Sequence, residues 1–319
     1  MKKILILTGD PNSINSEIII KSWRKIKSSI KQKIIFVSNF KLLSSQLKVL
    51  GYAEKLEKLE NIYDNNKSSK IKILDIDIKF KDPFNISKKE ASKFIKNSLN
   101  LAHILAQGPD VKGLINCAID KKLLEKKNIG ITEYLASKCD IKNDSVVMLL
   151  KGDKFSVSPI TTHIPIKLIS KKLRVKTIEN KIKLINNWFK KHYKKTPKFA
   201  VLGLNPHNGE LLKDSEEKKI IIPAIKKLTK KKITIVGPIP ADSIFSQSYK
   251  NFDIIVGMYH DQVLAPFKAL NKFEGINITL GLKYLRVSPD HGTAKDLVKK
   301  NKAKIESFLS CINFLEKFK

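Results

Sequence analysis

The chain contains few cysteines, and they are poorly spaced for pairing. Its 319 residues include only Cys117, Cys139 and Cys311. Their odd number and wide spacing match neither a disulfide framework nor a zinc knuckle. We therefore expect each cysteine to be a small buried apolar side chain.

Long apolar runs are also missing from the sequence. No run approaches the roughly 20 residues that an apolar helix needs to cross a bilayer. The apolar start of the chain is interrupted at Gly9, Asp10 and Pro11, too early for a signal peptide. The sequence predicts a cytoplasmic protein with no membrane partner.

Arginine is scarce although the chain is strongly basic. The formal net charge is +32 at pH 7, yet arginine occurs only at Arg24, Arg174 and Arg286. Proteins that read nucleic acids favour the bidentate fork of arginine, whereas lysine is a hydrated point charge. The lysines are also spread along the whole chain. We expect a solvated, lysine-rich surface that attracts anionic substrates and no nucleic-acid partner. A basic nucleic-acid-binding protein is a distant alternative.

Two glycine-rich signatures of nucleotide binding do not occur. No G-x-G-x-x-G motif follows a predicted strand, and there is no G-x-x-x-x-G-K-[ST] motif. The sequence therefore argues against a Rossmann dinucleotide site and against a P-loop ATPase. Any nucleotide is held in another way.

Apolar runs of strand length alternate with longer amphipathic segments, a pattern typical of an α/β protein. Residues 54–82 are polar and irregular, and we expect an excursion between elements there. Pro223 is expected to kink or divide the fourth helix. The predicted strands are 4–7, 33–37, 113–115, 145–150, 155–158, 199–204, 233–236 and 253–256. The predicted helices are 16–28, 88–107, 177–192, 215–228 and 293–318.

Three of the six histidines follow a predicted strand through a short polar turn, namely His163, His207 and His260. Ligands of α/β sheets bind at the carboxyl ends of strands, so these side chains could converge there. Three neutral imidazoles leave coordination positions open, as in a catalytic metal centre. Ordinary loop histidines are the alternative that the residues alone leave open. His103 and His192 lie in predicted helices, where we expect surface or interface positions.

A second group of polar residues follows His260, namely Lys268, Asn277 and Arg286. Because arginine is so rare here, Arg286 suggests a task that lysine cannot perform, such as a bidentate bond to a carboxylate or phosphate. A structural salt bridge is the alternative. Residues 290–293 look like a turn into a helix, where free N–H groups can bind an anion.

Several sequence blocks resemble the signature motifs of the 4-hydroxythreonine-4-phosphate dehydrogenase family, in the family's order and at compatible spacing. Gly9–Pro11 and Glu17 resemble its N-terminal block, and Thr132 with Glu133 resembles a middle one. The similarity therefore spans nearly the whole chain. The other matching blocks are Thr161–His163, Gly203–His207, Gly237–Asp242, Tyr259–Gln262, Asn277–Leu282 and Asp290–Ala294.

The resemblance implies a fold and an assembly. The fold is α/β with two lobes, like that of isocitrate and isopropylmalate dehydrogenases, and the active site lies in the cleft between the lobes. Residues 1–133 and 276–319 are expected to form the first lobe, and residues 134–275 the second, which carries the metal histidines. The family is homodimeric, with a metal site shared between subunits.

The resemblance also implies roles for individual residues. His163, His207 and His260 match ligands of a divalent metal ion, for which zinc is favoured and cobalt, magnesium or manganese are alternatives. The second cofactor is NAD or NADP. The matched substrate-binding positions are Thr132, Lys268, Asn277 and Arg286. The matched catalytic positions are Asp242, Asp261 and Lys268. The matched cofactor-binding positions are Leu280, Gly281, Asp290 and Gly292.

The implied reaction is the NAD(P)-dependent oxidation of the secondary alcohol of 4-phosphooxy-L-threonine in vitamin B6 biosynthesis. The resulting β-keto acid then loses carbon dioxide and gives 3-amino-2-oxopropyl phosphate. Positive charge from Lys268 and Arg286 suits an anionic substrate of this kind.

Three departures from the family pattern bear on the substrate. Ile131 replaces a histidine that normally precedes Thr132, and residues 12–16 lack two glycines and a proline of the N-terminal block. Residues 116–118 read Asn-Cys-Ala instead of a threonine-glycine-proline stretch. A dehydrogenase of another four-carbon acid 4-phosphate, such as a sugar-acid phosphate, is therefore an alternative. A metal-dependent phosphatase is a further one, although the sequence shows no obvious nucleophile.

Overall fold

A computed structural model of the chain describes residues 2–64, 68–124, 130–139, 141, 145–246, 248–271 and 274–318. These residues form two compact units. Unit 1 comprises Met1–Ile131 and Lys283–Phe318, and unit 2 comprises Thr132–Leu282. The finer lobe boundaries expected from the sequence stay a prediction.

Unit 1 is built on a parallel sheet in which six described strands follow the order β3-β4-β2-β1-β5-β12. The central strands are continuous apolar runs, and every residue of Ile4–Leu7 is buried. Such runs are typical of parallel strands that are covered on both faces. The strands are β1 (Lys3–Leu7), β2 (Ile34–Ser38), β3 (Leu56–Leu59), β4 (Ile71–Asp75), β5 (Val111–Asn116) and β12 (Arg286–Pro289).

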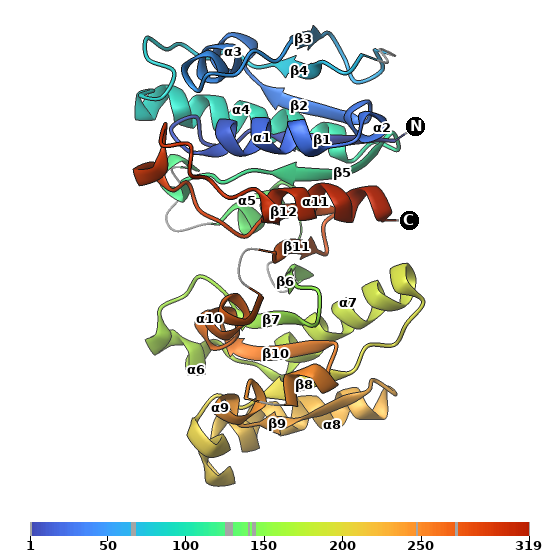
Figure 1. Cartoon of the computed structure of the whole chain (residues 1–319). Coiled ribbons are helices and arrows are strands. Elements are labelled where there is room, and N and C mark those ends of the chain that lie inside the picture. Colours follow the sequence, from blue (N-terminus) through green and yellow to red (C-terminus); the bar gives the residue numbers. More distant parts are fainter. Residues whose placement is uncertain are drawn as a thin grey trace. The chain divides into compact units, whose positions relative to one another are not determined.

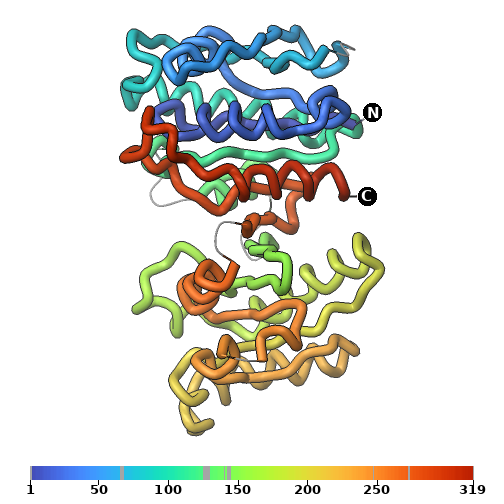
Figure 2. Tube along the Cα trace, viewed as in Figure 1, coloured from blue at the N-terminus to red at the C-terminus, as the bar shows by residue number. Residues whose placement is uncertain are grey.

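Helices cover both faces of the sheet of unit 1. Helix α4 packs on β1, β2 and β5, whereas α1 and α11 pack against each other in front of the sheet (Figure 1). The trace in Figure 2 shows the C-terminal segment beside the N-terminal one. Ser87 caps α4 by accepting from the backbone N–H of Glu90. The helices are α1 (Asn15–Lys25), α2 (Ser28–Lys31), α3 (Phe40–Val49), α4 (Lys88–Ala106) and α11 (Glu306–Lys317).

Unit 2 contains a mixed sheet with the strand order β11-β6-β7-β10-β8-β9. The β11–β6 and β6–β7 pairs are antiparallel, whereas β7, β10, β8 and β9 are parallel to one another. The strands are β6 (Val147–Lys151), β7 (Ser156–Thr161), β8 (Phe199–Leu202), β9 (Ile235–Ile239), β10 (Ile254–Tyr259) and β11 (Ile276–Leu280). The helices are α5 (Ile131–Lys138), α6 (Ile169–Lys172), α7 (Val175–Tyr193), α8 (Ile222–Lys230), α9 (Ala241–Ile244) and α10 (His260–Asn271).

The core of unit 2 fixes α10 against the sheet. Val263, Leu264 and Phe267 of α10 are buried together with residues of β6, β7, β8 and β10. The ring of Phe267 lies edge-on to Phe155, with 5.6 Å between the ring centroids. The first turn of α10, which begins at His260, is therefore held firmly at the end of β10.

Two sequence expectations about the elements are wrong. The segment predicted as an irregular excursion contains β3 and β4, and β4 is buried almost throughout. Of the range 293–318 that was predicted as one helix, only α11 forms an α-helix, because the backbone before it is left-handed at Ala294, Lys299 and Asn301. The expected division at Pro223 is confirmed, since a π-helical turn, Glu217–Ile221, ends directly before α8.

The cysteine expectation is confirmed. Cys117, Cys139 and Cys311 are all buried and unpaired. Burial raises the pKa of the Cys117 thiol far above its usual range, so this side chain stays a neutral, apolar group. None of the helices that the structure describes has the length and apolar character needed to cross a membrane.

Candidate active site

The three strand-end histidines follow three neighbouring parallel strands of unit 2. His163 follows β7, His260 follows β10 and His207 follows β8, and β10 lies between the other two strands. Tyr259 of β10 pairs with Thr161 of β7, so these two strands end at the same level. The topology therefore places all three histidines at the carboxyl edge of one sheet, where ligands of α/β proteins bind.

Two of these imidazoles lie close together. The ring centroids of His163 and His260 are 5.7 Å apart, and the ring planes are inclined by 43°. Each ring contacts a carboxylate through Nδ1, with Glu133 Oε1 at 3.5 Å from His163 and Asp261 Oδ1 at 2.7 Å from His260. Such contacts select the tautomer and leave Nε2 to bind a cation.

Glu133 is the less exposed of the two carboxylates. Burial alone raises its pKa, but the contacts with His163 and the bond from the Thr162 hydroxyl outweigh this effect and lower the pKa to about 2. Glu133 is therefore ionised and favours a positively polarised imidazole beside it. Sequence reasoning placed Glu133 in a motif block but assigned it no role.

His207 lies on a strained loop after β8. It is exposed, with a φ of 50°, and the next residues are left-handed as well. Within one chain, no three His, Cys, Asp or Glu side chains among the described residues gather closely enough to hold a metal ion. The donor types nevertheless fit a divalent cation, because two adjacent imidazoles present Nε2 and a third stands on the neighbouring strand end.

The other predicted residues of unit 2 differ in their exposure. Lys268 is exposed in the last turn of α10, and Asp242 is exposed in the first turn of α9. The Asn277 Oδ1 atom is buried and has no hydrogen bond in the described part of the chain. The Thr132 hydroxyl lies 3.5 Å from the Thr279 hydroxyl. Asn277 thus offers an acceptor that a ligand donor could satisfy.

Arg286 is more deeply buried than we expect of a side chain that binds substrate. It is 3% exposed in β12, and its Nε donates to Asn116 Oδ1 of β5. This contact is a hydrogen bond to a neutral amide and not the salt bridge that was the alternative, and the substrate-binding role of Arg286 stays a prediction. Asp290 follows on the same strand end, and the Cβ position of Gly292 is open. Residues 290–293 lead into a single 3-10 turn and not into a long helix.

The remaining positions matched to cofactor binding lie at the end of β11. Leu280 is 2% exposed. Gly281 has a φ of 97°, and a Cβ there would lie 2.1 Å from the Ser145 carbonyl oxygen. Gly281 is therefore required by the backbone turn itself.

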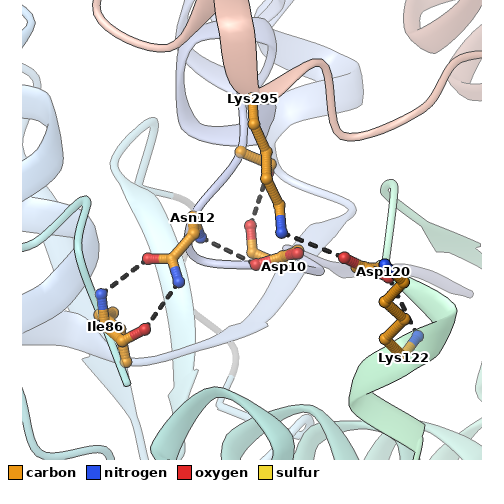
Figure 3. Close-up of polar contacts among 7 residues, drawn as sticks. Asp10, Asn12, Ile86, Asp120, Lys122 and Lys295 are labelled. Atoms are coloured by element: carbon orange, nitrogen blue, oxygen red, sulfur yellow. Dashed lines mark hydrogen bonds and ion pairs between the residues drawn. The ribbon is translucent and has the colours of Figure 1, made fainter. Parts of the chain in front are cut away.

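Unit 1 contains a polar cavity that sequence reasoning missed. Its volume is about 300 Å³, and Figure 3 shows its polar contacts. The side-chain amide of Asn12 donates to the Ile86 carbonyl and accepts from the Ile86 N–H, at 2.8 Å each. Lys295 Nζ donates to Asp120 Oδ2 at 3.1 Å. The cavity is lined by Asp10, Asn12, Ile86, Lys88, Asp120, Lys122, Leu123 and Lys295.

Asn12, which lines the cavity, belongs to one of the segments that depart from the family pattern. Asn15, in the segment that lacks the usual glycines, donates through Nδ2 to the carbonyls of Thr8 and Ala118 at 2.9 and 2.8 Å. Ala118 belongs to the other altered segment. One side chain of the first altered segment therefore bonds the backbone of the second. In the sequence, the two departures taken together were the signal that pointed to this part of unit 1.

Asp10 gives this cavity a testable pH signature. The side chain is 1% exposed, and burial raises its pKa although the Asn12 N–H and Lys295 oppose the shift. The folded protein therefore binds this proton more tightly than the unfolded chain, so ionisation of Asp10 lowers stability as the pH rises through its pKa. We expect Asp10→Asn, which retains an acceptor for Asn12 N–H, to raise Tm at pH 7.

The measurement is thermal unfolding as a function of pH. The stabilisation by Asp10→Asn should shrink as the pH falls below about 4, where aspartate is protonated in both states. Asp214→Asn is the control, because its side chain is 93% exposed. A lower Tm of Asp10→Asn at pH 7 contradicts the assignment of burial as the dominant effect.

The family model described as pyridoxal phosphate biosynthetic protein PdxA matches residues 29–315. The chain belongs to this family. The resemblance seen in the motif blocks is thereby confirmed over most of the sequence.

Relatives with printed names agree with this assignment. A 4-hydroxythreonine-4-phosphate dehydrogenase of Sulfurihydrogenibium sp. is 36% identical over 98% of this chain and 97% of its own length. A protein named putative D-threonate 4-phosphate dehydrogenase, from Oceanobacillus iheyensis, is 33% identical over 97% of this chain and 95% of its own length. The chain is therefore similar along its length to dehydrogenases of both names.

Solved structures confirm the fold class. The crystal structure of 4-hydroxythreonine-4-phosphate dehydrogenase from Klebsiella pneumoniae matches with a TM-score of 0.85 and 29% identity, covering 99% of both chains. Isocitrate dehydrogenase from Methylococcus capsulatus matches with a TM-score of 0.50 at 11% identity, over 98% of this chain and 84% of that one. The latter shows only the shared α/β fold. The protein is an enzyme of a dehydrogenase family, which implies a nicotinamide cofactor and suits a small phosphorylated substrate.

Proposed function

We propose that this PdxA-family protein oxidises the secondary alcohol of 4-phosphooxy-L-threonine in vitamin B6 biosynthesis. A hydride passes from the carbinol carbon to NAD or NADP, and the hydroxyl proton passes to a base. The β-keto acid then releases carbon dioxide, and protonation of the remaining carbanion gives 3-amino-2-oxopropyl phosphate. The observation that carries the proposal is the carboxylate-supported pair of imidazoles at the carboxyl edge of the unit 2 sheet.

The proposed metal ligands are His163, His207 and His260, and zinc suits them best, with cobalt, magnesium or manganese as alternatives. A bound divalent ion supplies Lewis acidity, which lowers the pKa of a substrate hydroxyl and stabilises developing negative charge. Glu133 and Asp261 hold the Nδ1 side of two rings. We further propose a homodimer that completes the site, since His163 and His260 lie together in one chain whereas no third ligand joins them among its described residues.

The substrate is proposed to bind Thr132, Lys268, Asn277 and Arg286. Lys268 is exposed and cationic, which suits a phosphate, and Asn277 Oδ1 is a buried acceptor suited to the substrate ammonium or hydroxyl. Asp242, Asp261 and Lys268 are the proposed catalytic residues, and the two carboxylates are the proposed proton acceptors. Because Asp261 already contacts His260, the exposed Asp242 carboxylate has greater freedom to accept a proton.

The dinucleotide is proposed to bind Leu280, Gly281, Asp290 and Gly292. The polar cavity of unit 1 supports this placement. Its lining includes Lys295, which stands three positions after Gly292 in the chain. Lys88, Lys122 and Lys295 line it and would attract a pyrophosphate.

Ile131 is the observation behind a second candidate substrate. It begins α5, next to Thr132, and cannot donate a hydrogen bond to the substrate. The relative named for D-threonate 4-phosphate makes a sugar-acid phosphate the second candidate. Both reactions are alcohol oxidations on a four-carbon acid 4-phosphate. They differ in the substituent that lies next to the carboxylate.

The test is NADH or NADPH formation on each substrate with added divalent metal. We expect a higher kcat/KM for 4-phosphooxy-L-threonine than for 4-phospho-D-threonate. Restoring a polar contact with Ile131→His should raise kcat/KM about tenfold, since one such bond contributes roughly 1–3 kcal/mol. Ile166→His, at a 76% exposed isoleucine of unit 2, is the control and should change nothing. A preference for the threonate ester selects the second candidate.

A further inference from the structure

The loop that carries His207 is built around one buried carboxylate. We propose that Glu217 is a positioning residue, which holds this loop so that His207 is presented for metal binding. The inference rests on the proposed role of His207 as a metal ligand. It assigns a function to an acidic residue ten positions away that does not itself bind the ion.

Glu217 is enclosed and multiply bonded. It is 0% exposed, at the start of the π-helical turn before α8. Its Oε1 accepts from the backbone N–H groups of Leu204 and Asn205 at 2.7 and 2.8 Å, and its Oε2 accepts from Asn205 Nδ2 at 3.0 Å. All three donors lie in the short segment between β8 and His207. The carboxylate therefore fixes the position from which this loop departs.

Both glycines that flank the loop make room for the same carboxylate. A Cβ at Gly203 would lie 3.1 Å from Glu217 Oε1, and a Cβ at Gly209 would lie 3.0 Å from Oε2. The loop thus closes over Glu217 on two sides. Within this enclosure the carboxylate satisfies the backbone N–H donors of the strand end.

The loop has a conformation that needs such external support. The φ angles of His207, Asn208, Gly209, Glu210 and Leu211 lie between 49° and 59°. Consecutive left-handed residues other than glycine are unfavourable by about 1–2 kcal/mol each. Asn208 Nδ2 adds a second support by donating to the Pro238 carbonyl at 3.1 Å. The surrounding bonds therefore determine where the His207 backbone lies.

The same support reaches the strand end that carries His260. Gln262, in the first turn of α10, accepts from Met258 N at 2.6 Å and donates to the Gly203 carbonyl at 2.7 Å. Gly203 is also one of the two glycines against Glu217. One network of hydrogen bonds thus links the ends of β8 and β10. This network therefore fixes the relative positions of the two segments that carry the proposed ligands His207 and His260.

Glutamine at position 217 is the sharpest probe of this arrangement. Glu217→Gln keeps the size of the side chain but removes its charge. With its carbonyl oxygen in the place of Oε1, its NH₂ group faces the Asn205 Nδ2 donor. We expect the zinc dissociation constant to rise about 10- to 100-fold, the effect typical of lost support for a metal ligand. The measurement is zinc competition against a fluorescent chelator on the full-length protein. The cobalt(II)-loaded variant should also show an altered visible absorption spectrum.

Controls separate this inference from the proposed function. Glu179→Gln removes another buried carboxylate of unit 2, which pairs with Lys183 on α7, and should leave zinc affinity and the cobalt spectrum unchanged. His207→Ala should weaken zinc binding. If His207→Ala weakens it and Glu217→Gln does not, Glu217 is not a positioning residue and the metal assignment stands. If His207→Ala has no effect, the metal assignment itself fails.

A milder variant covers the case in which Glu217→Gln does not fold. Asn205→Ala removes one of the three bonds to Glu217 and leaves its two backbone partners in place. We expect a smaller rise in the zinc dissociation constant, with Tm close to wild type. Unchanged zinc binding in a folded Asn205→Ala variant, beside weakened binding in His207→Ala, overturns the inference.

Discussion

His260→Ala is expected to lower kcat/KM by about 10³-fold, which corresponds to roughly 4 kcal/mol of transition-state stabilisation. His260 contributes one of the two imidazoles that already lie together, and Asp261 holds its Nδ1 side. Alanine removes a proposed ligand without unpairing a fully buried group, since the His260 side chain is 33% exposed. Steady-state NADH formation and zinc content measure the effect.

A chelator should produce a comparable loss in the wild-type protein, reversed by added zinc or cobalt. His192→Ala is the matched control, because His192 is another histidine of unit 2, on α7, where its ring packs on Trp188. Its activity should equal that of the wild type. Full activity of His260→Ala, or of chelator-treated protein freed of metal, contradicts a catalytic role for the imidazole cluster.

Arg286→Lys is expected to lower the free energy of unfolding by about 2 kcal/mol, a fall in Tm of about 4–8 °C. The buried guanidinium donates through Nε to Asn116 Oδ1, and a lysine ammonium cannot reproduce this planar geometry. Asn116 would be left with a poorly satisfied acceptor. Thermal unfolding with and without substrate measures both the structural and the binding contribution.

Arg24→Lys is the control for this substitution. Arg24 pairs with Glu54 at the surface, where its side chain is 55% exposed, and such pairs contribute little. A Tm of Arg286→Lys equal to that of the control, together with a raised KM, shows that Arg286 serves the substrate alone. A lower Tm with a raised KM shows that it serves both purposes.

The sequence predicted the strands that are uninterrupted apolar runs. Ile4–Leu7 is the clearest case, and it forms the buried centre of the unit 1 sheet. Strand β4 was not predicted because Lys72 interrupts its apolar run. This lysine is nevertheless 1% exposed, and its Nζ donates to the Gln32 carbonyl. The left-handed backbone at Lys299 and Asn301 could not be predicted from the sequence either, because neither position carries the glycine that marks such turns.

The candidate site was predicted in its residue types but not in its geometry. Chain order puts β8 between β7 and β10, whereas in the sheet β10 lies between β7 and β8. The neighbours of each histidine therefore depend on a crossover that local sequence does not encode. Glu133 and Glu217 illustrate the same limit, since their partners lie 29 and 12–13 positions away in the chain. His103, expected at a surface or interface, is 7% exposed and contacts the Tyr284 hydroxyl.

The chain order of the two units has a consequence for biosynthesis. Unit 2 is one uninterrupted stretch, whereas β12 and α11 of unit 1 are translated only after it. Ribosomes add about 5–20 residues per second, so β5 waits on the order of 10 seconds or more, while unit 2 is made, before its neighbour β12 is synthesised. A nascent chain stalled at residue 282 therefore exposes one bare edge of the N-terminal sheet. Docking of β12 on β5 closes this edge, which is open to chaperones until then.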